Sequence, residues 1–262
     1  MVRARRTRRT PARTGVRAET DQLRLARQVQ EALLPPPLTA LPGLEVVARF
    51  CPSRSVGGDF YDYFSLRSRY LCLYLGDVQG KGLEGAMYAL LVSGLMRGLR
   101  KSDTEPADVI AFLNRRLAFR SLPGKFACLL YAVVDLQTRQ LTLANAGLPF
   151  PFLLRDGIAT RVQVAGIPVG MFDTCDYEQA VVTLRPGDRL LLFTDGLSDS
   201  LEALRPREGD GEQQLAALFA QPASTSATAL GDAFLARLRP ARKSARPQDL
   251  HDDATFLLLH VH

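Results

Sequence analysis

The chain has 262 residues, and 47% of them are hydrophobic, so it is long enough to form one sizeable mixed domain around a buried core. Its formal net charge of +6 is misleading, because residues 1–18 carry seven arginines and no acidic residue. The remaining 26 Lys and Arg nearly balance 27 Asp and Glu. The excess of basic residues therefore lies only in an N-terminal leader. The balance in the remainder argues against a domain that binds nucleic acid through a broad basic surface.

Residues 1–20 predict a disordered basic leader, because blocks of like charge repel one another. Contact of its arginines with nucleic acid or an anionic membrane is the alternative. The leader has no apolar segment of the kind found in secretory signals, and the longest apolar stretch, residues 85–96, is too short to cross a bilayer. Four cysteines without a CxxC pair predict reduced thiols in a soluble cytoplasmic protein.

Residues 21–34 predict an amphipathic helix with Asp21 as its N-cap, ended by the prolines at 35–37. Its apolar stripe must pack against the same domain or against a partner's copy, so residues 21–35 are expected to form a regulatory lead-in helix. The stripe consists of Leu23, Ala26, Val29 or Gln30, and Leu33.

Residues 40–262 predict one domain in which helices and strands come in separate runs. Such segregation favours an α+β fold, with helices outside antiparallel sheets, over a βαβ repeat. Hydrophobic periodicity predicts strands at 44–50, 70–75, 126–134, 141–145, 150–154, 178–184, 189–194 and 254–261, and helices at 82–100 and 106–119. Residues 203–240 are also predicted to be helical, with a Ser/Thr-Ala interruption near residues 222–228.

Four aspartates lie beside strands that are expected to be buried: Asp59, Asp77, Asp195 and Asp252. Each one alone is more typical of a turn than of a metal site. When two sheets pack face to face, however, strand ends from distant parts of the chain meet at one rim. Four carboxylates there supply the oxygen ligands that magnesium and manganese prefer, and two such cations can activate water and clamp a phosphoryl group.

Other kinds of active site lack their sequence signals. The three histidines, His251, His260 and His262, are not accompanied by a Gly-x-Ser-x-Gly elbow, which argues against a Ser/His/Asp hydrolase. The chain also has no GxxxxGK[ST] loop, which argues against a P-loop nucleotide hydrolase.

Six ordered motifs resemble those of the metal-dependent protein phosphatases (PPM, type-2C-like), specifically of their bacterial RsbU/SpoIIE branch. The resemblance covers most of residues 22–262. Its motifs are the lead-in segment ARQVQEALLP at 26–35, VGGDFYD at 56–62, GDVQGKG at 76–82, NAG at 145–147, TDG at 194–196 and DDAT at 252–255.

This resemblance implies a PPM-type β-sandwich of two antiparallel sheets flanked by helices. It also implies two Mn²⁺ or Mg²⁺ ions and two-metal hydrolysis of phosphoserine or phosphothreonine on a protein. By motif position, Asp77 would bridge the metals, assisted by the carbonyl of Val78. Asp195 and Asp252 would hold one ion, and Asp59 would bind the other directly or through water.

The resemblance also implies three supporting residues. Asp253 stands where relatives can carry Asn and is expected to support the ligands, while Gly58 lets the backbone approach the site. Arg54 is a candidate phosphate-facing cation, with a solvated arginine as the simpler alternative. The chain departs from the branch at Leu148, where His usually follows NAG, and at Asp199, where Glu is common.

The implied substrate is a phosphorylated STAS-type anti-anti-sigma factor, or a similar antagonist protein, in a bacterial partner-switching pathway. Activation is expected through homodimerisation of residues 21–34 or docking of a regulator there. Two other classes stay open: a non-catalytic PPM-fold module that binds a phosphoprotein, and a nucleic-acid-binding protein that acts through the arginine-rich leader.

Overall fold

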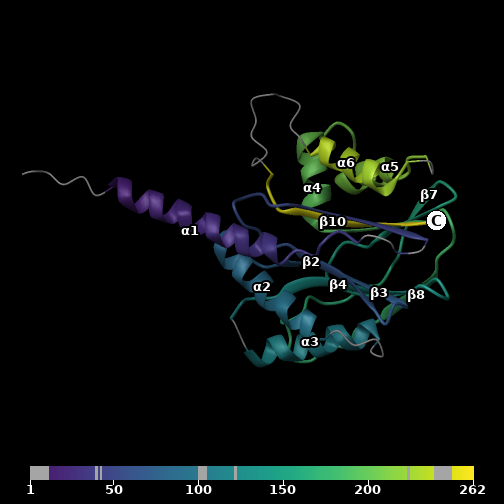
Figure 1. The fold of residues 1–262 in the computed structure, drawn as a ribbon, viewed down its shortest axis with the longest axis horizontal. Coiled ribbons are helices and arrows are strands. Elements are labelled where there is room, and N and C mark those ends of the chain that lie inside the picture. Colours follow the sequence, from purple (N-terminus) through teal and green to yellow (C-terminus); the bar gives the residue numbers. More distant parts are fainter. Residues whose placement is uncertain are drawn as a thin grey trace, which may run out of the picture.

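Two five-stranded antiparallel sheets pack face to face, with a helical layer on each outer side (Figure 1). The structure is a computed structural model that describes residues 12–38, 41, 43–99, 105–120, 123–222, 225–238 and 250–262. The arrangement confirms the predicted fold class, an α+β sandwich of two antiparallel sheets flanked by helices.

The first sheet has the strand order β1-β10-β9-β6-β7, and the second has the order β2-β3-β4-β5-β8. The last strand of the chain thus lies beside the first, which brings distant segments together. In chain order the strands are β1 Leu44–Cys51, β2 Phe60–Leu66, β3 Tyr70–Val78, β4 Ala127–Asp135, β5 Gln140–Ala146, β6 Phe152–Arg155, β7 Ile158–Arg161, β8 Gln179–Thr183, β9 Arg189–Phe193 and β10 Ala254–Val261.

The central strands are buried on both faces, because each sheet is covered by the other sheet on one side and by helices on the other. In β3, Leu71, Leu73 and Leu75 lie in the core between the sheets. Cys72 and Tyr74, which alternate with them, lie in the core beneath the helices. Successive strand residues point to opposite faces, so a strand covered on both sides reads as a continuous apolar run.

Helices α2 (Gly82–Gly98) and α3 (Pro106–Arg120) cover the second sheet. Helices α4 (Asp195–Leu204), α5 (Gly211–Phe219) and α6 (Ala227–Arg237) cover the first. Helix α1 (Ala12–Ala32) packs beside α2 and extends away from the sandwich (Figure 1). None of the described helices has the length and apolar character needed to cross a membrane.

The lead-in helix differs from its prediction. Because α1 begins at Ala12, the predicted N-cap at Asp21 is wrong, and residues 12–20 of the predicted disordered leader are helical. Alanine and arginine are strong helix formers, and they extend the helix beyond the point where the apolar stripe begins. The arginines at positions 3–9 lie outside the described residues.

Three elements were missing from the prediction or misplaced in it. β2 begins directly after a Gly-Asp turn signal that masked it, and the short strand β7 follows the turn at Asp156-Gly157. The helical region predicted at 203–240, with an interruption near residues 222–228, contains α5 and α6, while α4 before them already begins at Asp195. Asp195 is therefore the first residue of a helix rather than a turn residue.

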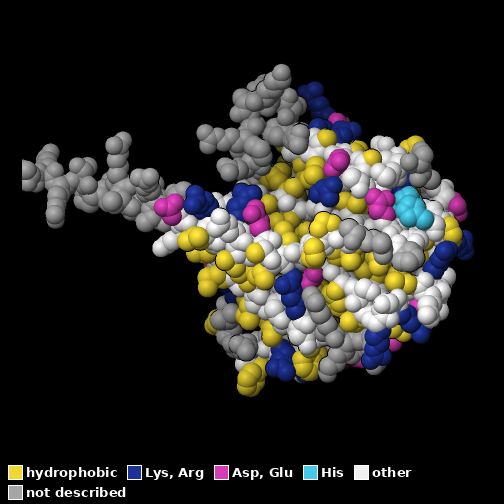
Figure 2. Space-filling model, in the orientation of Figure 1, with side chains coloured by type: hydrophobic (Ala, Val, Ile, Leu, Met, Phe, Trp, Pro, Cys, Tyr) yellow, Lys and Arg dark blue, Asp and Glu magenta, His cyan; other side chains and the backbone are white. Residues whose placement is uncertain are grey.

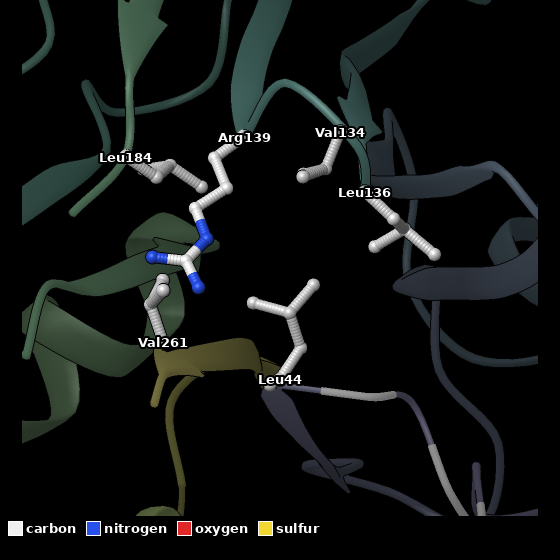
Figure 3. A pocket seen from close by; sticks show the side chains of 7 residues that line it. Leu44, Val134, Leu136, Arg139, Leu184 and Val261 are labelled. Atoms are coloured by element: carbon white, nitrogen blue, oxygen red, sulfur yellow. The ribbon is translucent and has the colours of Figure 1, made fainter. Parts of the chain in front are cut away.

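A cavity of about 10 Å³ lies between the two sheets at the end where β1 begins (Figure 3). Leu44, Val134 and Leu184 line it, and the side chain of Arg139 reaches across toward Val261. A cavity of this size holds one water molecule at most, so it cannot bind a substrate. The aspartates lie at the opposite end of the sandwich.

Candidate metal centre

Asp59 and Asp77 meet at one end of the β2–β3 pair. Phe60 pairs with Gly76 in antiparallel register, which places the preceding Asp59 opposite Asp77. A side chain at Gly76 would overlap the ring of Phe60, so the glycine is needed for this close approach. The charge of Asp77 helps to raise the pKa of Asp59. Asp59 is buried and Asp77 is half-buried, so the strand pair by itself brings two of the predicted ligands together.

Asp195 and Asp252 lie at the neighbouring ends of β9 and β10 in the first sheet. Between them, Thr194 and Thr255 are joined by a backbone hydrogen bond of 3.0 Å from the N–H of Thr194 to the carbonyl of Thr255. A side chain at Gly196 would overlap the backbone at the Asp252–Asp253 turn. The start of α4 can therefore pack against that turn only because residue 196 is a glycine.

Hydrogen bonds between buried side chains join the two sheets at this rim. The hydroxyl of Thr194, on the first sheet, donates to Oδ2 of Asp59, on the second, at 2.8 Å. The Oδ1 atom of Asp253 accepts from the backbone N–H and the hydroxyl of Ser53 at 2.7 and 2.9 Å. Its Oδ2 atom accepts from the N–H of Gly58 at 2.6 Å. Asp253 thus holds the loop that carries Asp59.

Electrostatic repulsion links the four carboxylates with one another. Burial, together with repulsion from Asp77 and Asp253, raises the pKa of Asp59 well above its ordinary value. Burial, together with repulsion from Asp195 and Asp252, raises the pKa of Asp77 to about 7. Burial and the nearby Asp252 also raise the pKa of Asp195. The cluster carries more negative charge than its neighbours neutralise, which is the condition in which added cations stabilise a fold.

The donor atoms suit hard divalent cations. Aspartate oxygens are the ligands that magnesium and manganese prefer, and the cluster gathers four carboxylates at one rim. The nearby thiol of Cys128 is unsuited to metal binding at neutral pH, because burial and the charges of Asp77 and Asp195 raise its pKa to about 12. The residues present therefore fit a magnesium- or manganese-type centre.

Gly58, in the loop before β2, packs closely against Val78 at the end of β3. A Cβ atom at Gly58 would lie 3.3 Å from Oδ1 of Asp77, 3.2 Å from Cγ2 of Val78 and 3.1 Å from the carbonyl oxygen of Gly80. A larger residue at position 58 would therefore push these loops apart. Val78 ends β3 directly after Asp77, with its side chain buried.

Two basic residues border the cluster. Lys81, in the GKG motif, lies with its Nζ 2.7 Å from Oδ2 of Asp252 and also donates to the carbonyl of His251 at 3.0 Å. The sequence motif contained this lysine, but its contact with Asp252 was not predicted. Arg54 is exposed, and its Nη1 would lie 3.9 Å from a Cβ at Gly82. It is therefore near the loop between β3 and α2.

Helix α1 reaches the loop that carries Asp59 through Gln30, a contact that the sequence prediction missed. The Nε2 of Gln30 donates to the carbonyl of Gly57 at 2.8 Å, and its Oε1 accepts from the N–H of Gly57 at 3.1 Å. Gln30 is buried, whereas Val29 is 52% exposed, so of the two alternatives for the stripe it is Gln30 that packs against the domain. The sequence signal for this contact is that Gln30, a polar residue, lies in line with the apolar stripe of the helix.

The two departures from the resembled pattern have different surroundings. Leu148 is buried in the core between the sheets, and its backbone N–H and carbonyl pair with the side chain of Asn145 at 3.0 and 2.9 Å. Asp199, on α4, is exposed for the most part. Partial burial of its carboxyl group raises its pKa, and the charges of Asp195 and Asp252 raise it further. Asp199 therefore adds negative charge to the border of the cluster.

The sequence model of the family described as Stage II sporulation protein E (SpoIIE) matches residues 67–262, three quarters of the chain. The chain belongs to the SpoIIE family. Three of the four clustered aspartates lie inside the matched range, and Asp59 lies just before it.

Named relatives of this SpoIIE-family protein are larger than the matched region. This SpoIIE-family protein is 32% identical over 208 residues to Protein IcfG of Synechocystis sp., and the match covers 68% of this chain and 33% of IcfG. It is 26% identical over 181 residues to Phosphoserine phosphatase RsbU of Bacillus subtilis, covering 68% of this chain and 54% of RsbU. The SpoIIE-family protein thus corresponds to about half or less of these relatives.

Solved structures show the same fold. The SiaA-PP2C domain of Pseudomonas aeruginosa superposes with a TM-score of 0.79 at 22% identity, over 97% of this chain and 100% of that domain. The structure of the PP2C phosphatase domain of SpoIIE from Bacillus subtilis, with a fragment of its regulatory domain, superposes with a TM-score of 0.68 at 19% identity, over 83% and 63%. The SpoIIE-family protein therefore has the PP2C phosphatase fold.

Proposed function

We propose that this SpoIIE-family protein is a metal-dependent protein serine/threonine phosphatase. The observation that carries the proposal is the meeting of Asp59 and Asp77, from the second sheet, with Asp195 and Asp252, from the first. Burial and the neighbouring carboxylates raise the pKa values of Asp59, Asp77 and Asp195, so mutually repelling carboxylates lie together at one rim of the fold. Such an arrangement is unfavourable for a purely structural role and is suited to binding cations.

Within the proposed centre, Asp77 would be the ligand that both ions share, because it lies opposite Asp59 in the β2–β3 pair and is repelled by Asp195 and Asp252. Asp195 and Asp252 would hold one Mn²⁺ or Mg²⁺ ion, and Asp59 the other, with the carbonyl of Val78 assisting. When bound, such ions supply Lewis-acid chemistry, namely activation of water and neutralisation of phosphoryl charge.

The neighbouring residues fix where the carboxylates point. Thr194 orients Asp59 through its 2.8 Å hydrogen bond, and Asp253 fixes Gly58, so the backbone that leads into Asp59 is held at both places. Lys81 neutralises part of the charge of Asp252. Arg54, exposed beside the loop between β3 and α2, is placed to attract the phosphate group of an incoming phosphoprotein.

We propose that the substrate is a phosphoserine or phosphothreonine on a regulatory protein, specifically a STAS-type anti-anti-sigma factor in a partner-switching pathway. The proposal is supported by the relatives named phosphoserine phosphatase, RsbU and RsbP of Bacillus subtilis. At this rim of the sandwich Asp195 is exposed and Asp252 is half-buried, so a phosphorylated loop of another protein can reach them.

We propose that α1 carries a regulatory contact with a second copy of the chain. Leu25 and Val29 are 59% and 52% exposed on a helix that extends away from the sandwich (Figure 1). Leu83 and Met87 on the neighbouring α2 are also exposed, and Figure 2 shows hydrophobic side chains gathered below α1. The two helices together form an apolar surface next to the contact of Gln30 with the loop that carries Asp59.

The decisive experiment measures release of phosphate from a phosphoserine protein of the STAS type in manganese and after chelation. We expect manganese-dependent turnover in the wild type and none in Asp77→Ala or Asp195→Ala, both of which should keep the wild-type circular dichroism spectrum. Wild-type-like rates in both variants would refute the assignment. Tight binding of the phosphoprotein without turnover would instead support a non-catalytic binding module.

A further inference from the structure

Three side chains at the far end of the first sheet form a second group of metal-binding type. Glu45 on β1 pairs directly with His260 on β10, and His262 follows two residues later, so the three side chains share one face of the sheet. One ligand atom from each lies within 4.8 Å of the others. Figure 2 shows histidine and acidic side chains side by side near the end marked C in Figure 1.

His260 gives an independent indication of an absent ligand. Its side chain is 7% exposed, and its Nδ1 has no hydrogen-bond partner among the described residues. Buried polar atoms are normally paired, because water is no longer available to them, so an unpaired imidazole nitrogen in a member of this group calls for a binding partner.

Glu45 is held in position by the start of α6. Its carboxylate accepts hydrogen bonds from the N–H groups of Ala227 and Thr228 at 3.1 and 3.2 Å, and from the hydroxyl of Thr228 at 3.0 Å. A carboxylate accepts about four hydrogen bonds, so these three leave a lone pair for another partner. Glu45 is therefore a fixed ligand group with remaining capacity.

His262 is the adjustable member of the group. Its Nε2 lies 4.0 Å from Oε2 of Glu45, which is longer than a hydrogen bond. Two ligand atoms on a tetrahedral zinc ion, at bond lengths of about 2.0–2.1 Å, are separated by about 3.3 Å. The side chain of His262 is 55% exposed, so rotation of its ring can close the difference.

We propose that Glu45, His260 and His262 form a binding site for a zinc-class transition metal, separate from the aspartate cluster. Two imidazoles and one carboxylate are ligands that suit zinc, cobalt, nickel or copper, whereas magnesium and manganese favour all-oxygen sites. Three protein ligands leave a fourth position open for water or for a donor from another molecule. The bound ion would link β1, β10 and the start of α6.

The test is metal binding by the untagged full-length protein with magnesium in large excess, so that the aspartate cluster is occupied. Zinc uptake is measured by titration calorimetry, and cobalt binding by its visible absorption. We expect one zinc equivalent in the wild type and a loss of affinity of more than about tenfold in His262→Ala and in His260→Ala. Even outer partners of metal ligands contribute about 10- to 100-fold to affinity.

The control is His251→Ala, which removes the third histidine of the chain, an exposed residue outside the group. It should bind zinc as the wild type does. Glu45→Gln keeps an oxygen that can accept from Thr228 but loses the charge, and it should weaken zinc binding without unfolding α6. Equal zinc uptake by the wild type and His262→Ala, or equal loss in His251→Ala, would overturn the proposal.

Discussion

The carboxylate of Asp253 accepts a 2.6 Å hydrogen bond from the backbone N–H of Gly58, which lies 195 residues earlier in the chain. Its other oxygen accepts two hydrogen bonds from Ser53. Three donors stabilise this buried charge, and the contact joins the loop before β2 to the turn before β10. The alignment of ligands from distant segments therefore depends on a residue that need not touch a cation itself.

Replacing Asp253 should reduce both stability and metal affinity. In Asp253→Ala, three buried donors lose their acceptor, so we expect the free energy of unfolding to fall by about 1–3 kcal/mol or more. Ser53→Ala removes only the hydroxyl donor, and we expect a fall of about 0.5–1.5 kcal/mol. Urea unfolding and manganese titration of both variants measure the effects. Unchanged manganese affinity in Asp253→Ala would contradict the supporting role proposed for this residue.

Neutralising the central aspartate should stabilise the protein when no metal is bound. Asp77 is half-buried and is repelled by Asp195 and Asp252, so Asp77→Asn removes an unfavourable charge while keeping the size of the side chain. We expect a higher midpoint of thermal unfolding for Asp77→Asn than for the wild type in EDTA at pH 8, and loss of phosphatase activity in manganese. A lower midpoint in EDTA would show that repulsion is not the dominant effect there.

The metal-free protein should lose stability as the pH rises. The pKa of Asp77 is raised to about 7 in the folded protein, mainly by burial, whereas an unfolded aspartate titrates near about 3.9. The folded state therefore retains a proton that the unfolded state releases, and the free energy of unfolding should decline from about pH 4 to about pH 7 and then level off. Urea unfolding across this range, in EDTA, measures the slope.

Saturating magnesium should remove this decline, because the cations bind the deprotonated carboxylates and stabilise them in the folded state. Asp77→Asn in EDTA should show a shallower decline than the wild type. A slope that is equal in all three conditions would show that the aspartate cluster does not control the pH dependence.

Gln30 should hold the loop that carries Asp59 in place against α1. Gln30→Leu removes both hydrogen bonds to the backbone of Gly57 and leaves the N–H and carbonyl of Gly57 unpaired. We therefore expect the free energy of unfolding to fall by about 1–3 kcal/mol and manganese to bind more weakly. Gln28→Leu is the matched control, because Gln28 is exposed on the same helix. If both variants bind manganese as the wild type does, α1 does not influence the centre through this contact.

Helix α1 should mediate self-association. Leu25→Glu combined with Val29→Glu places charges on the exposed apolar face, so we expect it to lower the dimer fraction measured by light scattering during gel filtration. Arg24→Glu combined with Gln28→Glu is the control on neighbouring exposed positions. A wild-type protein that is strictly monomeric, and fully active without residues 1–34, would argue against this regulatory role.

Local sequence patterns were sufficient for much of the fold and for the choice of site residues. The apolar runs predicted β3, β9 and β10, and the glycine-aspartate motifs pointed to Asp59, Asp77, Asp195 and Asp252, because strand burial and turn chemistry are properties of neighbouring residues. β2 was missed because a turn motif and a strand overlap there, and the start of α4 was misplaced for the same reason.

Only the tertiary structure decided which residues from distant segments of the chain meet. The contacts of Asp253 with Gly58, Thr194 with Asp59 and Gln30 with Gly57 span 195, 135 and 27 residues. The pairing of Glu45 with His260 likewise depends on β10 lying beside β1. Periodicity reports which face of an element is buried, but the partner buried against it is set by sheet order and register, which short segments do not encode.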